Sequence, residues 1–552
     1  MSALLHKSPS RRRKSSTCGI GSVVLSGALS LSLACSSNEP TQPSSSDEQI
    51  CAEATVGPPL LRRLSGRELE NSLGDIFPTI KAIGWAGGKL GVDPVSHMGF
   101  GNDAQVLQVN QQTAQEILDT AEDVAGYVTN AGILPLVLPC STFTPDRTCA
   151  TTFVRDTGRR LFRRPLSDAE RNEYLGLYDS MKQKADFPTA IKWTLVAMIQ
   201  SPNSIYRSEL GVADGDGYKL SQHELASELA YTFSGTTPTV ALLDKADRGE
   251  LATPEALHAE AVALIATPRG QDVVRQLFRS WFRYERAATV TRPDVVNYFN
   301  VRNSLVEETK RFIDQVVLSD RGGLNQLLTA NYTFLDATLV THYGYGTASG
   351  GFARTQRPPE WGIGVLAQGA ILAANAQAQS SSPTQRGLLV FEKLLCNVRP
   401  EPPKNIPPLP PIMPGQKTTR DRYESQHAVG SCAFCHKQFD PIGFTFEHFD
   451  EVGRYRNDEK GLPINDSGRA LTATDQVSIE ATGQADLAQK LASRDDVRSC
   501  AADMMAAYAY GLSEGQPRCL IGKLRPNMQS GDQSVLEYLT GLTAAPHFTR
   551  RR

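Results

Sequence analysis

The sequence has few of the features that mark common enzymes or nucleic-acid-binding proteins. It contains no HExxH or P-loop motif, so the usual signatures of zinc proteases and P-loop nucleotide-binding enzymes are absent. Its 57 lysines and arginines nearly balance 59 aspartates and glutamates, which gives a formal net charge of −2. Nucleic-acid-binding domains usually show a strongly basic face or motif, so we expect no nucleic-acid partner.

Strand-like alternation of polar and apolar residues is also scarce, whereas apolar residues recur at helical spacing. Three helix starts carry a capping box, with serine at the N-cap and glutamate three residues later, at Ser65, Ser167 and Ser221. The pattern predicts helices over about 104–129, 167–184, 187–200, 221–233, 254–267, 270–286, 302–318, 484–511 and 533–542. We therefore predict a mainly α fold built from serial small helical bundles.

The N-terminus has the pattern of an export signal. Four basic residues at 11–14 precede an apolar stretch over 20–34 that is too short to span a membrane comfortably. The sequence LSLAC at 31–35 resembles a bacterial lipobox, whose cysteine is lipidated. We predict a signal peptide over 1–34, a lipid on Cys35 and a Ser/Pro-rich tether over 35–58. An ordinary secretory peptide cleaved nearby is the alternative. Because Ser36 does not resemble an inner-membrane retention signal, we expect an outer-membrane lipoprotein that faces the periplasm or the surface.

Export changes how the ten cysteines are interpreted, because an oxidising compartment permits disulfides. Cys18 lies in the signal and Cys35 is the lipid site, while Cys432 and Cys435 belong to a separate motif. The even remainder is what three disulfides would give: Cys140 with Cys149, Cys500 with Cys519, and Cys51 with Cys396 by elimination. Sequence alone does not settle this connectivity.

The motif that carries chemistry is Cys432-Ala433-Phe434-Cys435-His436, the attachment signature of c-type haem. Two cysteines one helical turn apart reach the two vinyl groups of one porphyrin, and the adjacent histidine lies under the iron. This attachment takes place outside the cytoplasm, so the motif and the export signal support each other. We predict one haem c, bound covalently by Cys432 and Cys435, with His436 as the proximal iron ligand. The resulting haem module would resemble a cytochrome c.

Three other interpretations of the motif stay open. A zinc site would usually need a second pair of ligands nearby, and a redox disulfide usually lies in a βαβ unit. Chance occurrence of so short a pattern is the third. Asp440-Pro441-Ile442-Gly443 follows closely, and a proline carbonyl there would accept a hydrogen bond from the second ring nitrogen of His436. A plain turn is the alternative.

The sixth iron ligand is open among several residues. Met504 and Met505 lie on a predicted helix downstream of the motif, whereas His427 and Met413 lie upstream of it. Methionine would raise the reduction potential and histidine would lower it, while an open site would permit small-ligand chemistry. Met413 belongs to a segment in which eight of the fifteen residues from Pro400 to Pro414 are proline. That composition predicts an extended strap.

The chain resembles, over nearly all its length past residue 58, a family of secreted bacterial proteins made of serial domains of unknown function, abundant in planctomycetes. The matching stretches, in order, are LRRLSGREL (61–69), RRLFRRPLS (159–167), QSP (200–202), LASELAY (225–231), SPTQRG (382–387), CAFCH (432–436), DPIGF (440–444), GRYR (453–456) and AYAYGL (507–512). The resemblance implies haem c but no securely known activity.

These observations divide the chain into helical domains over 59–130, 140–210 and 217–346, a proline strap and haem module over 352–457, and a helical domain over 470–549. One-electron transfer with a partner redox protein is the expected function. A haem enzyme with an open distal site, performing peroxidase-like or oxidative chemistry, is one alternative. A non-catalytic cell-surface binding scaffold is the other, so whether the protein is an enzyme stays open.

Overall fold

The computed structural model describes residues 56–85, 87–96, 98–138, 140, 145–399, 418–427, 432–471, 478–512, 520 and 533–552. The chain divides into two compact units, 1–47 and 48–552, and every described residue belongs to the second. The predicted signal peptide and the proline strap lie outside the described residues, as do Cys35, Cys51, Met413 and Cys519. Within the described residues, no helix is both long and apolar enough to cross a lipid bilayer.

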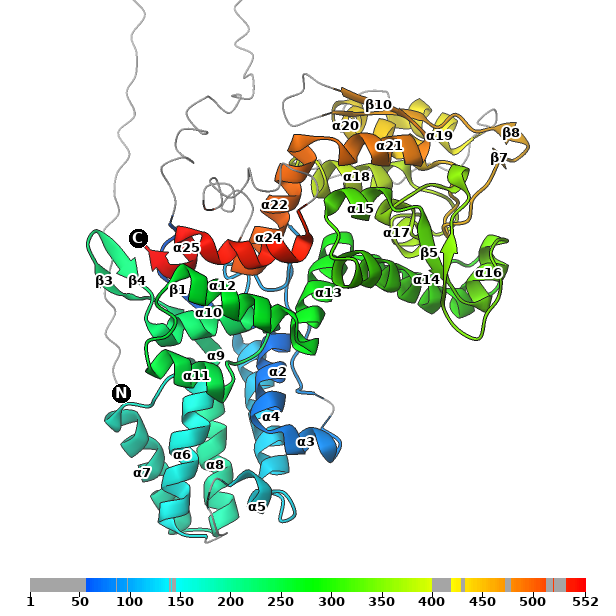
Figure 1. The fold of residues 1–552 in the computed structure, drawn as a ribbon. Coiled ribbons are helices and arrows are strands. Elements are labelled where there is room, and N and C mark those ends of the chain that lie inside the picture. The colour runs from blue at the N-terminus through cyan, green and yellow to red at the C-terminus, as the bar shows by residue number, and fades with distance from the viewer. Residues whose placement is uncertain are drawn as a thin grey trace, which may run out of the picture. The chain divides into compact units, whose positions relative to one another are not determined.

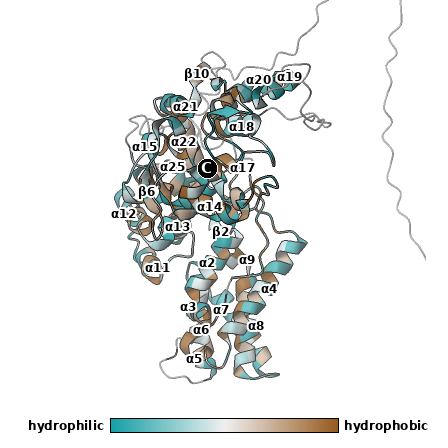
Figure 2. Cartoon of the chain, turned by 90° about the vertical axis from the view of Figure 1, so that its right-hand side faces the viewer, coloured by the Kyte–Doolittle hydropathy of each residue, from teal (hydrophilic) through white to brown (hydrophobic). Residues whose placement is uncertain are grey.

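The first third of the described chain is a group of helices around one hydrophobic core (Figure 1). Helices α4 (Gln111–Val128) and α8 (Phe187–Gln200) pack against each other, and both carry apolar and polar residues (Figure 2). The other helices of this group are α2 (Gly66–Ile76), α3 (Pro78–Ala82), α5 (Leu134–Val137), α6 (Arg147–Phe162), α7 (Asp168–Lys182) and α9 (Pro202–Ile205).

A second and larger hydrophobic core gathers residues from 98 to 548. Its N-terminal helices are α10 (Gln222–Ser234), α11 (Val240–Asp247), α12 (Pro254–Ile265), α13 (Pro268–Phe282) and α14 (Tyr298–Ile313). Its later helices are α15 (Leu324–Thr329), α16 (Ala337–Tyr343), α17 (Gly369–Ala374), α18 (Pro383–Lys393), α20 (Cys432–Gly443), α21 (Gly483–Ala492), α22 (Asp495–Tyr510), α24 (Val535–Gly541) and α25 (Pro546–Thr549). Helix α19 (Thr419–His427) packs against α20. Residues from the predicted domains over 217–346, 352–457 and 470–549 therefore share one core.

Strands are short and pair antiparallel, in agreement with the prediction of a mainly α fold. Strand β1 (Leu60–Arg63) pairs with β2 (Tyr206–Glu209), and this pairing sets Arg62 opposite Arg207. Strand β4 (Gly217–Lys219) lies between β3 (Val212–Asp214) and the C-terminal β11 (Arg550–Arg551). The remaining pairs are β5 (Tyr332–Leu335) with β6 (Ala353–Gln356), β7 (Asp458–Glu459) with β8 (Leu462–Pro463), and β9 (Ser467–Leu471) with β10 (Ser478–Thr482).

The three predicted capping boxes are confirmed. Ser65, Ser167 and Ser221 each cap a helix, and the glutamate three residues later bonds back to the serine amide. The helix predicted over 484–511 is instead two helices, α21 and α22. The backbone turns extended at Arg494, with φ −99° and ψ 137°, and Asp495 and Asp496 then occupy the first turn of α22. Acidic residues are favoured there by the helix dipole, so a new helix begins.

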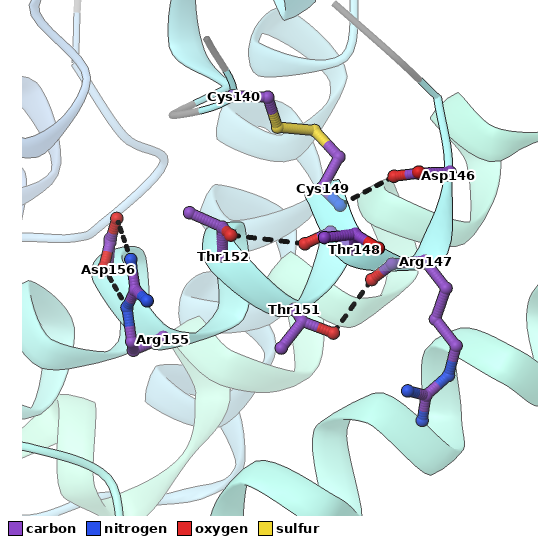
Figure 3. The surroundings of a disulfide bond; sticks show 9 residues. All are labelled: Cys140, Asp146, Arg147, Thr148, Cys149, Thr151, Thr152, Arg155 and Asp156. Carbon is purple, nitrogen blue, oxygen red and sulfur yellow. Dashed lines mark hydrogen bonds and ion pairs between the residues drawn. A yellow bond between two sulfur atoms is a disulfide. The ribbon is translucent and has the colours of Figure 1, made fainter.

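Two disulfides join described residues. Cys140 is bonded to Cys149, at the start of α6, as the sequence predicted, and Asp146 caps that helix by accepting from the Cys149 amide at 2.8 Å (Figure 3). Cys396, by contrast, is bonded to Cys500, with the two Cα atoms 5.4 Å apart. The predicted pairs Cys500–Cys519 and Cys51–Cys396 are therefore wrong. The physical reason is that α22 packs against α18, which brings Cys500 to the loop after α18.

Candidate functional site

The CxxCH motif forms the first turns of α20 (Cys432–Gly443). Cys432 and Cys435 are one helical turn apart, and both thiols are free and partly exposed. The other described cysteines are all in disulfides. Phe434, which lies between the two cysteines in the sequence, is 62% exposed. The first turn of α20 thus carries two free thiols and an exposed aromatic residue.

The C-terminal half of α20 is fixed by a close approach to α18. A Cβ atom on Gly387 of α18 would lie 1.9 Å from the carbonyl oxygen of Phe439, and one on Gly443 would lie 1.8 Å from that of Pro383. Neither distance is possible for a real side chain, so both positions require glycine. Phe439 and Ile442 are buried there. The glycines thereby hold the motif helix against the large core.

His436 is oriented by the carboxylate of Asp440, one turn further along α20. Its Nδ1 atom lies 3.2 Å and 3.1 Å from the two carboxylate oxygens. His427, at the end of α19, also approaches this carboxylate through Nδ1, at 2.5 Å. The two imidazole rings lie against each other, with their centroids 3.6 Å apart and their planes tilted by 32°. With Nδ1 directed to the carboxylate, Nε2 is the ring nitrogen of His436 that is available to a metal.

Asp440 is 4% exposed and also accepts a hydrogen bond from Thr384 Oγ1 of α18 at 2.6 Å. Burial acts to raise the pKa of Asp440, but the hydrogen bonds from His427, His436 and Thr384 outweigh it and the pKa is lowered. The carboxylate therefore stays charged. This arrangement corrects the expected hydrogen bond from His436 to a proline carbonyl. Helix α20 continues through Pro441 to Gly443, so the side chain four residues along is the nearest partner of the His436 ring.

A second buried acid, Glu447, lies just after α20 and is 1% exposed. It accepts hydrogen bonds from Ser381 Oγ at 2.9 Å and Arg456 Nη2 at 3.1 Å. Burial raises the pKa of Glu447 to about 7, although Arg386 and Arg456 act to lower it. Arg386 donates to four backbone carbonyls, including those of Phe449 and Asp450, and so holds the segment that follows the motif helix.

Of the predicted sixth ligands that the structure describes, His427 contacts His436, whereas Met413 lies outside the described residues. Met504 and Met505 are each 1% exposed in α22, which packs against α10, α13, α18, α21 and α24. Among the described residues, the ring contacts and hydrogen bonds of His436 involve His427, Phe439 and Asp440, and no residue of α22.

Two residues of this site, Asp440 as the partner of His436 and Thr384, are not among the residues predicted from the sequence. The first had a signal, because a histidine and an acid four residues apart face each other on any helix. No sequence signal points to Thr384, since α18 and α20 are separated by the proline-rich segment.

His427, His436 and Asp440 each offer a ligand atom within 4.8 Å of the others, a set that a divalent metal ion would also accept.

The fold and the site define a mainly α, multi-domain protein with a CxxCH helix held against its larger core. Family models match four successive parts of the chain, and each is described only as a protein of unknown function: PSD3 (DUF1587) at 62–130, PSD5 (DUF1595) at 149–209, PSD4 (DUF1592) at 220–345 and PSCyt3 (DUF1588) at 363–459. The chain therefore carries these four domains of unknown function, and the CxxCH helix lies inside the last of them. No curated protein and no solved structure matches the chain.

Proposed function

We propose that this chain is an exported, membrane-tethered protein that binds one haem c and transfers single electrons to or from a partner redox protein. The observation that carries the proposal is the pair of free thiols, Cys432 and Cys435, one turn apart on α20 and directly followed by His436. When bound, a c-type haem supplies a one-electron iron couple. The lipid on Cys35 would hold the protein at the outer membrane, within reach of a partner.

The residues present fit this group. Cys432 and Cys435 would form the two thioethers, and His436 would offer Nε2 to the iron. Asp440 would hold the His436 ring through Nδ1, which raises the basicity of a metal-bound imidazole. Phe434 supplies exposed apolar surface in the same helical turn as the two thiols.

A second candidate, a haem enzyme with an open sixth position, is favoured by the surroundings of His436. Met504 and Met505 are enclosed in the large core. His427 lies beside His436, and both rings approach the carboxylate of Asp440. Neither arrangement favours a sixth protein ligand, and an open position permits small-ligand chemistry.

The first experiment is a pyridine haemochrome spectrum of the full-length protein, exported from a host with c-type maturation. We expect a c-type spectrum from the wild type and none from Cys432→Ala/Cys435→Ala. The matched control is Cys140→Ala/Cys149→Ala, which also removes two cysteines but leaves α20 intact and should keep the haem. Exported, folded wild-type protein without haem would overturn the proposal, and bound metal at His427, His436 and Asp440 would then be assayed.

The spin state of the haem separates the two candidate functions. A low-spin ferric spectrum with a protein sixth ligand supports electron transfer, whereas a high-spin ferric haem that binds cyanide readily supports the enzyme.

The lipid tether is tested separately. Cys35→Ala should move the protein from the outer-membrane fraction to the soluble periplasmic fraction. Unchanged fractionation of that variant would contradict lipid anchoring.

A further inference from the structure

A polar cavity lies where the two hydrophobic cores meet, and no residue of the CxxCH helix lines it. It has a volume of about 250 Å³ and is lined by the start of α2, the loop around 92–102, α10, α13 and α22. Four arginines line it, Arg62, Arg67, Arg207 and Arg269, together with the acids Glu68 and Asp93. The charges that face the cavity are therefore mainly positive.

Beneath the cavity lies a buried cluster of ionised side chains. Arg207 donates to Glu209 Oε1 at 3.1 Å and to Glu228 Oε2 at 2.9 Å. Arg551, from the C-terminal strand β11, donates to Glu209 Oε2 at 2.6 Å. These four side chains are each no more than 2% exposed. Both oxygens of Glu209 are thus occupied by Arg207 and Arg551.

Arg62 is the cation that this cluster does not satisfy. It is 6% exposed, and its Nε atom lies 3.3 Å from Glu209 Oε1 without forming a hydrogen bond. Counting Arg62, three buried guanidinium groups share the two buried carboxylates of Glu209 and Glu228. The next nearest acid, Glu68, already accepts from the amide and hydroxyl of Ser65 in the capping box. A buried cation without a hydrogen-bonded counter-charge is costly, and a bound anion relieves that cost.

The other charged residues of the lining have partners of their own. Arg67 donates to Asp272, and Arg269 donates to both oxygens of Asp75. Asp93 accepts from Arg63 and from the amide of Gly66. Arg62 therefore differs from the three other arginines that line the same cavity.

A second unsatisfied group belongs to Asn102, which also lines the cavity. Asn102 donates through Nδ2 to the carbonyl oxygen of Tyr508 at 2.7 Å. Its Oδ1 atom is buried and accepts no hydrogen bond within the described part of the chain. A buried acceptor of this kind requires a donor, such as a hydroxyl group. The cavity lining thus includes a cation that shares its counter-charge and an acceptor without a hydrogen bond.

The geometry points to a binding site for a small hydroxylated carboxylate, of the sugar-acid class, whose carboxylate binds Arg62 and whose hydroxyl donates to Asn102 Oδ1. Arginine is the side chain best suited to a carboxylate, since its planar fork matches the two oxygens. The volume lies just below the range of about 300–1,000 Å³ typical of small-molecule pockets, which suits a ligand of monosaccharide size. The site requires no haem and is independent of the proposed function.

Isothermal titration calorimetry of the full-length protein with glucuronate tests the site, with glucose as the neutral comparison. We expect saturable binding of glucuronate and binding of glucose that is at least about tenfold weaker, since glucose lacks the carboxylate. Absence of glucuronate binding at about 10 mM, a weak affinity on the usual scale, would overturn the site. Equal binding of the two sugars would also overturn it, because Arg62 would then have no role.

Two substitutions of lining arginines locate the anion. Arg62→Gln should weaken glucuronate binding at least about tenfold, the loss of a charge-assisted hydrogen bond. Arg269→Gln is the matched control, because it removes the same charge from the same lining but from a side chain already paired with Asp75. It should weaken binding less than Arg62→Gln, and an equal loss would contradict the assignment.

If Arg62→Gln does not fold, Asn102→Ala decides the matter. Asn102 is only half-buried and lies in a loop, so the variant should fold. It should weaken glucuronate binding several-fold, by the loss of one neutral hydrogen bond. Unchanged glucuronate affinity in Asn102→Ala would remove the hydroxyl contact from the proposal and, with it, the assignment to a sugar acid.

Discussion

The site around His436 and the ion cluster beneath the cavity are both polar groupings at the edge of a hydrophobic core, but they are assembled in opposite ways. His427, His436 and Asp440 lie within a span of fourteen positions in the sequence and belong to two neighbouring helices. Arg62, Arg207, Glu228 and Arg551 come from nearly the whole described chain, joined by the β1–β2 pair and the C-terminal strand. The first is a local grouping, and the second exists only after the chain has folded.

The difference explains what each grouping can contribute. A local cluster needs little loop closure, so most of its geometry is set by helix spacing. A long-range cluster ties distant segments together, so its loss should loosen the whole fold. It also collects charges whose balance no local rule controls, which is how a cation such as Arg62 comes to lack a hydrogen-bonded partner.

The two disulfides give the largest expected test of this comparison. The Cys396–Cys500 bond closes a separation of 104 residues and the Cys140–Cys149 bond one of 9, which in the chain-entropy account contribute about 5 and about 3 kcal/mol. Replacing each pair by alanines should therefore lower the free energy of unfolding more for the long-range pair. Urea unfolding of both variants, under the same oxidising conditions, measures the difference. A larger loss from the Cys140/Cys149 variant would break the comparison.

The same distinction decides how much was predictable from the sequence. Ser65, Ser167 and Ser221 were identified as helix caps because a capping box needs only four consecutive residues. Hydrophobic spacing likewise gave the mainly α fold. The break between α21 and α22 was missed, since the apolar spacing continues through Ser493 and Arg494 and only the backbone turn at Arg494 separates the helices.

Long-range contacts were the part that the sequence could not supply. The pairing of Cys500 with Cys519 was chosen for nearness along the chain, whereas the packing of α22 on α18 decides the real partner. In the site, the CxxCH motif defined Cys432, Cys435 and His436 at once. Thr384 and the Arg62 cavity depend on packing between distant segments, for which a single sequence carries no signal.

Glu447 is intermediate between a local and a long-range grouping, because its partners Ser381 and Arg456 lie before and after the motif helix in the sequence. Its pKa is about 7 in the folded protein against a usual value of 4.5. Between these values the folded state holds a proton that the unfolded chain has lost, so stability falls as the pH rises from 4.5 to 7 and stays lower above it. This shift in pKa lowers the free energy of unfolding by about 3 kcal/mol above pH 7, relative to its value below pH 4.5.

Urea unfolding at pH 4.5 and pH 8 checks this prediction. Glu447→Gln should lose the part of the pH dependence that Glu447 contributes, so the wild type should destabilise more than the variant as the pH rises. Glu424→Gln is the matched control, since the Glu424 side chain is 51% exposed and its loss should leave the slope unchanged. Identical slopes for the wild type and Glu447→Gln would show that the acid is ionised throughout.

The smallest expected effect concerns two purely local interactions in different surroundings. Ser167 caps α7 in an exposed position, and Ser534 caps α24 while only 4% exposed. Each serine accepts a hydrogen bond from the amide three residues on, at 3.2 Å for Glu170 and 3.0 Å for Glu537. Replacing such a cap by alanine costs about 1 kcal/mol, with a range of about 0.5–2.

Ser534→Ala should fall at the upper end of that range and Ser167→Ala at the lower. Water can replace the lost partner of the Glu170 amide, whereas the amide of Glu537 is left unpaired in partly buried surroundings. Thermal unfolding of both variants, with the wild type alongside, measures the order. If Ser167→Ala costs as much as Ser534→Ala, burial adds nothing to a local interaction, and the contrast between local and long-range groupings rests on loop closure alone.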